Sequence, residues 1–120
     1  MTRVLLVEDE PHIIESLSFL LSRAGYDVDH VDNGAVAFET ISANPPDVLV
    51  LDAMLPGMNG FDLLRRIRAQ ESLAELPVLM LTAKGQKKDR EVANAIGADM
   101  FMIKPFNNSE LIDAVGQLAR

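Results

Sequence analysis

The chain has 120 residues, a formal net charge of −7 and no cysteine. This length suits one compact domain, which can bury enough surface to fold without a disulfide or a structural metal. The absence of cysteine excludes a disulfide scaffold and a thiolate metal site. The acidic charge argues against direct binding of nucleic acid, because phosphate backbones require a basic protein surface.

The start of the chain and its hydropathy indicate a cytoplasmic protein. The first predicted strand begins almost at Met1, which leaves no room for a signal peptide. No apolar run approaches the ~20 residues that a membrane-spanning helix needs. We therefore expect a cytoplasmic location and no contact with a membrane.

Strand-like and helix-like segments alternate five times, which predicts an α/β fold with a parallel sheet. An apolar run at residues 4–7 precedes a helix that begins at Pro11 and ends at Gly25. Residues 26–31 alternate apolar and polar side chains, which predicts a half-exposed edge strand. A shorter helix follows over residues 34–43.

The second half of the chain repeats this pattern. Apolar runs at residues 48–51 and 78–81 predict strands covered by helices on both faces, and Asn59 is suited to cap the helix between them. The next helix, after Gly85 and over residues 88–96, has few apolar residues and should open most easily. A last strand begins at Met100, and Asn107 with Glu110 predicts a capping box for the last helix.

Charged and hydroxyl side chains stand at the carboxyl ends of the predicted strands. They are Glu8, Asp9, Asp52, Thr82 and Lys104. Parallel strands share one edge for their carboxyl ends, so we expect these groups to meet there. Crowded carboxylates repel unless a cation lies among them. The pattern therefore indicates a Mg²⁺ site with a lysine opposite, suited to handling a phosphoryl group.

A simpler explanation covers part of this pattern. Acidic residues at 8–10 precede a helix, where they favour its N-terminal dipole without any further function. Asp52 has no such explanation, because the Ala-Met-Leu-Pro-Gly segment after it does not begin a helix. A partly buried carboxylate needs partners, and Lys104 is suited to be one.

Five sequence blocks resemble the receiver domain of bacterial two-component response regulators. They are Val-Glu-Asp-Glu at 7–10, Leu-Asp-Ala-Met-Leu-Pro-Gly-Met-Asn-Gly at 51–60, Leu-Thr-Ala at 81–83, Gly-Ala-Asp at 97–99 and Lys-Pro-Phe at 104–106. The resemblance spans the whole chain and implies one receiver domain over residues 1–120. It also implies a single doubly wound, flavodoxin-like domain, with a five-stranded parallel sheet in the order 2-1-3-4-5 flanked by five helices.

The resemblance implies a role for each carboxylate and for the lysine. Asp52 would be the sole phosphoacceptor. Glu8, Asp9 and Asp52 would bind Mg²⁺ together with the backbone carbonyl of Met54. Lys104 would balance the charge of the phosphoryl group.

Four more residues receive roles from the resemblance. Thr82 would bond a phosphoryl oxygen, Ala83 would leave room for the phosphoryl group, and Pro105 would follow a cis peptide bond. Thr82 and Phe101 would form the conformational switch.

The chemistry agrees with this assignment. A carboxylate can act as a nucleophile and form an aspartyl-phosphate, and phosphoryl transfer requires mainly alignment and charge compensation. Mg²⁺ prefers oxygen ligands and typically uses one or two carboxylates. The protein would thus modify itself, with phosphate from a sensor histidine kinase, a histidine phosphotransfer protein or a small phosphodonor, and would catalyse no other reaction.

We expect the face of the fourth helix, fifth strand and fifth helix to contact an output domain, a target protein or a second copy, because the fourth helix has few apolar anchors and Phe101 lies between two methionines on an edge strand. Two residues depart from the family pattern there. Phe101 stands where tyrosine is commoner, so the ring carries no hydroxyl. Met100 stands where winged-helix transcription factors usually have an acidic residue, which leaves their salt-bridged dimer mode open here despite Asp89 and Arg90.

Two alternative functions fit less well. A haloacid dehalogenase-like phosphatase would need a second aspartate two residues after the nucleophile, where this chain has Met54. A flavodoxin-like nucleotide binder would need a phosphate loop rich in glycine or hydroxyl groups after the first strand. The acidic residues at 8–10 would instead repel phosphate in the absence of a metal.

Two further expectations concern the phosphorylated state and the extent of the chain. The resemblance implies that Met54 and Lys84 border the approach of water to the phosphorus, and we expect apolar Met54 to make the phosphoprotein long-lived. The chain ends at Arg120 with its fifth predicted helix, so we expect no output domain within it. A stand-alone receiver and a piece of a longer regulator both fit this pattern.

Overall fold

The structure is a computed structural model that describes residues 1–83 and 87–119. Within these ranges, five strands form one sheet in the order β2-β1-β3-β4-β5, and neighbouring strands are parallel throughout. The strands are β1 Arg3–Val7, β2 Asp27–Val31, β3 Val48–Asp52, β4 Val78–Thr82 and β5 Met100–Ile103. The predicted α/β fold and strand order are confirmed.

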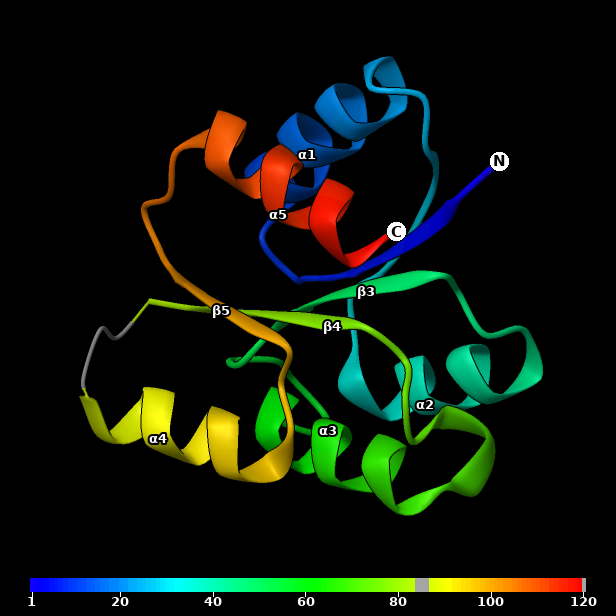
Figure 1. The fold of residues 1–120 in the computed structure, drawn as a ribbon, viewed down its shortest axis with the longest axis vertical. Coiled ribbons are helices and arrows are strands. Elements are labelled where there is room, and N and C mark those ends of the chain that lie inside the picture. The colour runs from blue at the N-terminus through cyan, green and yellow to red at the C-terminus, as the bar shows by residue number, and fades with distance from the viewer. Residues whose placement is uncertain (84–86, 120) are drawn as a thin grey trace.

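Helices cover both faces of the sheet. They are α1 Pro11–Arg23, α2 Gly34–Ala43, α3 Gly60–Ala69, α4 Lys87–Ile96 and α5 Asn108–Leu118, with a short 3-10 helix, η1, at Glu71–Leu73. Figure 1 shows α1 and α5 on one face and α2, α3 and α4 on the other. Gly85, expected just before α4, lies outside the described residues. None of the described helices is both long and apolar enough to cross a membrane.

Alternate side chains of the central strands enter two core layers, because successive residues of a strand point to opposite faces. Val4 and Leu6 pack with α1 and α5, whereas Leu5 and Val7 pack with α2, α3 and α4. All five residues of β3 and of β4 are buried, as the continuous apolar runs predict. The edge strand β2 is half-exposed, which also confirms the prediction.

Asparagine side chains cap three helices. The Oδ1 atom of Asn33 accepts from Ala35 N–H at 2.8 Å, and that of Asn59 accepts from Asp62 N–H at 2.9 Å. Asn107 caps α5 as predicted, but it accepts from Ser109 N–H at 2.8 Å, two residues on. A capping box would have used the residue three positions on, so the cap is simpler than expected.

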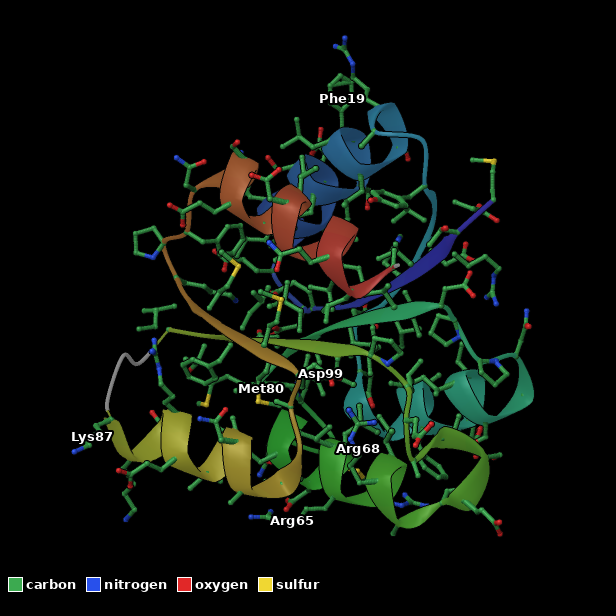
Figure 2. All side chains as sticks on the ribbon, viewed as in Figure 1. Phe19, Arg65, Arg68, Met80, Lys87 and Asp99 are labelled. Carbon is green, nitrogen blue, oxygen red and sulfur yellow. The ribbon has the colours of Figure 1, made fainter. Side chains whose placement is uncertain are left out.

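Arg68 of α3 joins segments that lie far apart in the sequence. Its guanidinium donates to the Gly97 carbonyl at 3.0 Å and to Asp99 Oδ2 at 3.1 Å, and Figure 2 shows Arg68 and Asp99 between α3 and β5. Asp99 Oδ2 also accepts from Val78 N–H at 2.8 Å. These contacts hold the C-terminal end of α4 against the sheet. The helix itself is weakly anchored, because Ala93 is its only fully buried residue.

Candidate functional site

Three of the predicted site residues form an ion cluster at the carboxyl edge of the sheet. The Nζ atom of Lys104, which follows β5, lies 3.0 Å from Glu8 Oε2 and 3.2 Å from Asp52 Oδ2. Glu8 is fully buried and Asp52 is 3% exposed. Buried carboxylates require compensation of their charge, and the lysine provides it for both.

Asp9 completes a group of three carboxylates. One oxygen of each of Glu8, Asp9 and Asp52 lies within 4.8 Å of the other two. Asp9 is exposed, unlike its neighbour Glu8, so the group opens to solvent on its side. A set of carboxylate oxygens with solvent access matches the preference of Mg²⁺, which keeps several waters. These residues therefore fit the cation that the sequence predicts.

The cluster changes the acidity of its members. Burial raises the pKa of Glu8 to about 7, and the negative charge of Asp52 acts in the same direction. Burial opposes the charge of Lys104, but its hydrogen bond with Glu8 and the charge of Asp52 outweigh this and raise the pKa of the ammonium above 10.5. The lysine therefore stays charged at neutral pH.

We expect the metal-free protein to lose stability as the pH rises from 4.5 to about 7. In this window the folded state holds the Glu8 proton more tightly than the unfolded chain, so a rise in pH favours unfolding. The shift corresponds to up to about 3 kcal/mol of unfolding free energy. Urea unfolding in a chelator at about pH 5 and about pH 8 measures it. Glu8→Gln should abolish this contribution, and an unchanged pH dependence in that variant would contradict the assignment.

The residues expected around the phosphoryl group lie at the same edge. Thr82 is 2% exposed at the end of β4, and its carbonyl accepts from Lys104 N–H at 2.7 Å. Ala83 is exposed. The bond between Lys104 and Pro105 is cis, as expected. Lys84 lies outside the described residues.

Phe101 and the flanking methionines lie on opposite faces of β5. Phe101 packs against the core layer on the side of α2, α3 and α4, and the guanidinium of Arg90 lies 5.5 Å from the centroid of its ring. Met100 and Met102 pack against the layer that contains α1 and α5. All three are half-buried on an edge strand.

The loop after Asp52, residues 53–59, is held to the site through its main chain. Met54 N–H donates to Asp52 Oδ1 at 3.2 Å, and the Met54 residue is 59% exposed. Gly60, which our sequence interpretation did not single out, donates its N–H to the Ala53 carbonyl at 2.9 Å. A Cβ atom at Gly60 would overlap the Asp52 carbonyl. The sequence marks Gly60 only by its place directly after the helix cap Asn59 and at the end of the block at 51–60.

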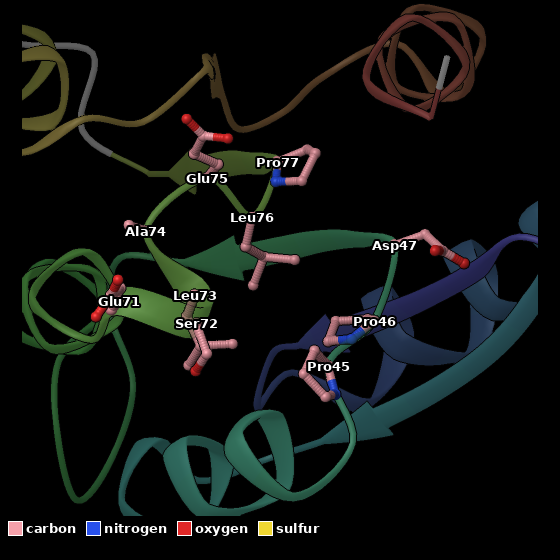
Figure 3. A pocket seen from close by; sticks show the side chains of 10 residues that line it. All are labelled: Pro45, Pro46, Asp47, Glu71, Ser72, Leu73, Ala74, Glu75, Leu76 and Pro77. Atoms are coloured by element: carbon pink, nitrogen blue, oxygen red, sulfur yellow. The ribbon is translucent and has the colours of Figure 1, made fainter.

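Hollows lie at both the carboxyl edge and the opposite edge of the sheet. One of about 460 Å³ adjoins the ion cluster and is lined by Lys104, Pro105, Phe106 and residues of α1. The other, of about 600 Å³, lies at the opposite edge, where β3 and β4 begin (Figure 3). Prolines and acidic residues line it, but none of the predicted site residues does. Of these two hollows, the one at the carboxyl edge is therefore the one that the predicted site residues line.

Known proteins resemble this chain in sequence and in fold. Residues 4–116 match the family described as the response regulator receiver domain. The chain is 39% identical over its full length to RpaA of Synechocystis, named a DNA-binding dual master transcriptional regulator, and covers 50% of it. It is 37% identical over its full length to PhoB of Rhizobium meliloti, named a phosphate regulon transcriptional regulatory protein, and covers 53% of it.

A solved structure agrees with these matches. The receiver domain of the Francisella response regulator 1452 superposes with a TM-score of 0.94 at 29% identity. The superposition covers 99% of this chain and 97% of that one. The chain spans about half the length of the two curated relatives.

Proposed function

The chain belongs to the response regulator receiver domain family of two-component systems, and on this basis we propose that it accepts a phosphoryl group on Asp52. Residues 1–120 would form one such domain. The observation that carries the proposal is the buried Asp52 carboxylate, 3.2 Å from the Lys104 ammonium and grouped with Glu8 and Asp9. This arrangement combines a nucleophile, a counter-charge and a cation site.

In the proposed reaction, an oxygen of Asp52 attacks the phosphorus of the donor. A bond forms between this oxygen and phosphorus, and the bond from phosphorus to the donor breaks, so that the donor leaves with the electron pair. The ammonium of Lys104 is already paired with the Asp52 carboxylate. In the reaction it would stabilise the negative charge that accumulates on the phosphoryl oxygens. Burial of Asp52 strengthens this interaction, although water screens the half-buried Lys104 in part.

Glu8, Asp9 and Asp52 would bind Mg²⁺ together with the Met54 carbonyl, and the bound ion would neutralise negative charge on the phosphoryl group. Thr82 stands at the end of β4, where its hydroxyl would bond a phosphoryl oxygen after transfer. Exposed Ala83 beside it adds no bulk that would obstruct the group.

The test of this function is incubation of the wild-type protein with acetyl phosphate and Mg²⁺, followed by measurement of the intact mass. We expect one phosphoryl adduct that requires Mg²⁺ and that a chelator prevents. Failure of the folded protein to acquire an adduct under these conditions would refute the proposed function.

The donor in the cell would be a phosphohistidine on a sensor kinase or a phosphotransfer protein. Relatives of about twice this length are named as transcriptional regulators, which supports an output domain or a target protein as the recipient of the signal. We propose that α4, β5 and α5 form the output face, with Thr82 and Phe101 as the switch. Weak burial of α4 and the half-buried β5 edge support this choice.

We expect beryllofluoride, a mimic of the phosphoryl group, to change amide exchange in α4 and β5. The reason is that α4 has a single fully buried residue, so a small change at Thr82 can alter its opening equilibrium. Exchange measured by mass spectrometry with and without beryllofluoride tests this, and peptides from β2 at the opposite edge serve as the control. Equal exchange across residues 87–106 in the two states would exclude this face as the switch.

We expect Met54→Asn to shorten the lifetime of the phosphorylated protein several-fold. The exposed Met54 side chain stands two residues after Asp52, and an apolar thioether cannot orient water, whereas an amide can. The decay of the phosphorylated mass after removal of the donor gives the rate. Met54→Leu, which keeps an apolar side chain, should decay like the wild type. An unchanged rate in Met54→Asn would leave Met54 only its backbone role.

A further inference from the structure

Both ends of the β3–α3 loop, residues 53–59, are fixed by main-chain hydrogen bonds. At its start, Ala53 N–H donates to the Leu81 carbonyl at 2.8 Å. At its end, Gly60 N–H returns to the Ala53 carbonyl at 2.9 Å. Met54 lies between these two anchors. The position of its carbonyl beside Asp52 therefore depends on how the rest of the loop is supported.

The N-terminus of α2 supports the middle of the loop. Gly34 N–H donates to the Pro56 carbonyl at 3.1 Å. The two segments approach so closely that a Cβ atom at Gly34 would overlap the main-chain carbonyl of Met58. Gly34 is buried, and a main-chain carbonyl cannot move aside as the end of a flexible side chain can. Glycine is thus required here for contact between the loop and α2.

A second contact lies beside the first. Gly57 has a φ of +82°, and a Cβ atom there would lie 2.6 Å from Asn33 Oδ1. The same oxygen caps α2 by accepting from Ala35 N–H. The loop therefore packs against the helix cap as well as against the first residue of the helix.

The segment of residues 31–34, from the last residue of β2 to the first residue of α2, also reaches the other side of the cation site. The carbonyl of Val31 accepts from Glu8 N–H at 3.1 Å, while Gly34 holds Pro56. One short segment thus contacts the main chain next to both groups of proposed Mg²⁺ ligands. A shift of this segment against the loop would change the distance between Met54 and the carboxylates.

We propose that Gly34 is a positioning residue for the Mg²⁺ site, which it serves by allowing the β3–α3 loop to close against α2. This inference rests on the proposed function, because it assigns the loop to Mg²⁺ binding. A methyl group at position 34 forces the loop outward while leaving every proposed ligand in the sequence. Residues that orient metal ligands from outside the ligand set typically change metal affinity by about 10- to 100-fold.

The experiment compares Mg²⁺ affinity in Gly34→Ala, Gly116→Ala and the wild type by isothermal titration calorimetry, without any phosphodonor. Gly116 in α5 is the matched control, because its new methyl group would meet only the Tyr26 hydroxyl at 3.5 Å. We expect Gly34→Ala to bind Mg²⁺ at least about 10-fold more weakly and Gly116→Ala to bind like the wild type. Circular dichroism verifies that each variant is folded at the temperature used.

If Gly34→Ala does not fold, Gly57→Ala replaces it, because a side chain is strained at the φ of +82° and its methyl group would lie 2.6 Å from Asn33 Oδ1, so the variant disturbs the same contact between the loop and the start of α2. A purely structural role would lower the melting temperature and leave the Mg²⁺ dissociation constant unchanged. An unchanged constant in the folded variant overturns the inference and leaves the proposed function standing. Absence of Mg²⁺ binding in the wild type would instead overturn the proposed function.

Discussion

Asp52→Asn should abolish the phosphoryl adduct that the wild-type protein forms with acetyl phosphate and Mg²⁺. An amide is neither a nucleophile of comparable strength nor able to form an acyl phosphate. Asp52 is also the buried carboxylate that both contacts the Lys104 ammonium and has an oxygen within 4.8 Å of an Asp9 oxygen, so it adjoins the counter-charge and the proposed cation site. Intact mass measured over time should show no adduct in this variant.

The matched control is Asp29→Asn, which makes the same chemical change at an exposed position of the edge strand β2. It should be phosphorylated like the wild type. A persistent adduct in Asp52→Asn would mean that a different carboxylate accepts the group, and exposed Asp9 would then be the first position to test.

Lys104→Met should destabilise the metal-free protein by about 3 kcal/mol at a pH above 7, where Glu8 is ionised. The substitution keeps the aliphatic volume of the side chain but leaves the buried carboxyl groups of Glu8 and Asp52 without a cation. They must then either stay charged in the protein interior or take up a proton, and both outcomes lower the free energy of unfolding relative to the wild type. Lys104 retains 15% side-chain exposure, so water screens the pair in part and the lower end of the range for buried ion pairs applies. Urea unfolding in a chelator measures the loss.

Mg²⁺ should restore much of this stability, because a ligand that binds only the folded state stabilises it by mass action. Lys88→Met on the exposed surface of α4 is the control and should change stability by less than about 0.5 kcal/mol. Equal unfolding midpoints for Lys104→Met and Lys88→Met would show that the lysine does not compensate the buried carboxylates.

The strands, the helices and the edge that contains the site follow from local patterns. Continuous apolar runs predict the fully buried strands β3 and β4, and the alternating run predicts the exposed edge strand β2. Once these strands are parallel, their carboxyl ends share one edge, so Glu8, Asp52 and Lys104 are expected along that edge. The order of the strands came from the family resemblance and not from these patterns.

Other features depend on contacts between segments that no local pattern connects. The adjacent residues Glu8 and Asp9 look alike in the sequence, yet one is buried against Lys104 and the other faces solvent. The contact of Asp99 with Arg68, 31 residues away, was not predicted either. Neither was the 3-10 helix η1, which the chain forms between α3 and β4.

Gly34 illustrates the physical reason. In the sequence, a glycine after the cap Asn33 looks like an ordinary helix start. Only the structure shows that a larger residue would not fit at position 34, because the Met58 carbonyl packs against it. Periodicity and capping residues reflect interactions within a few residues of the chain, which the sequence displays directly. Burial, ion pairing and close main-chain approach depend on how the helices and the loops pack on the sheet, and only the tertiary structure determines these.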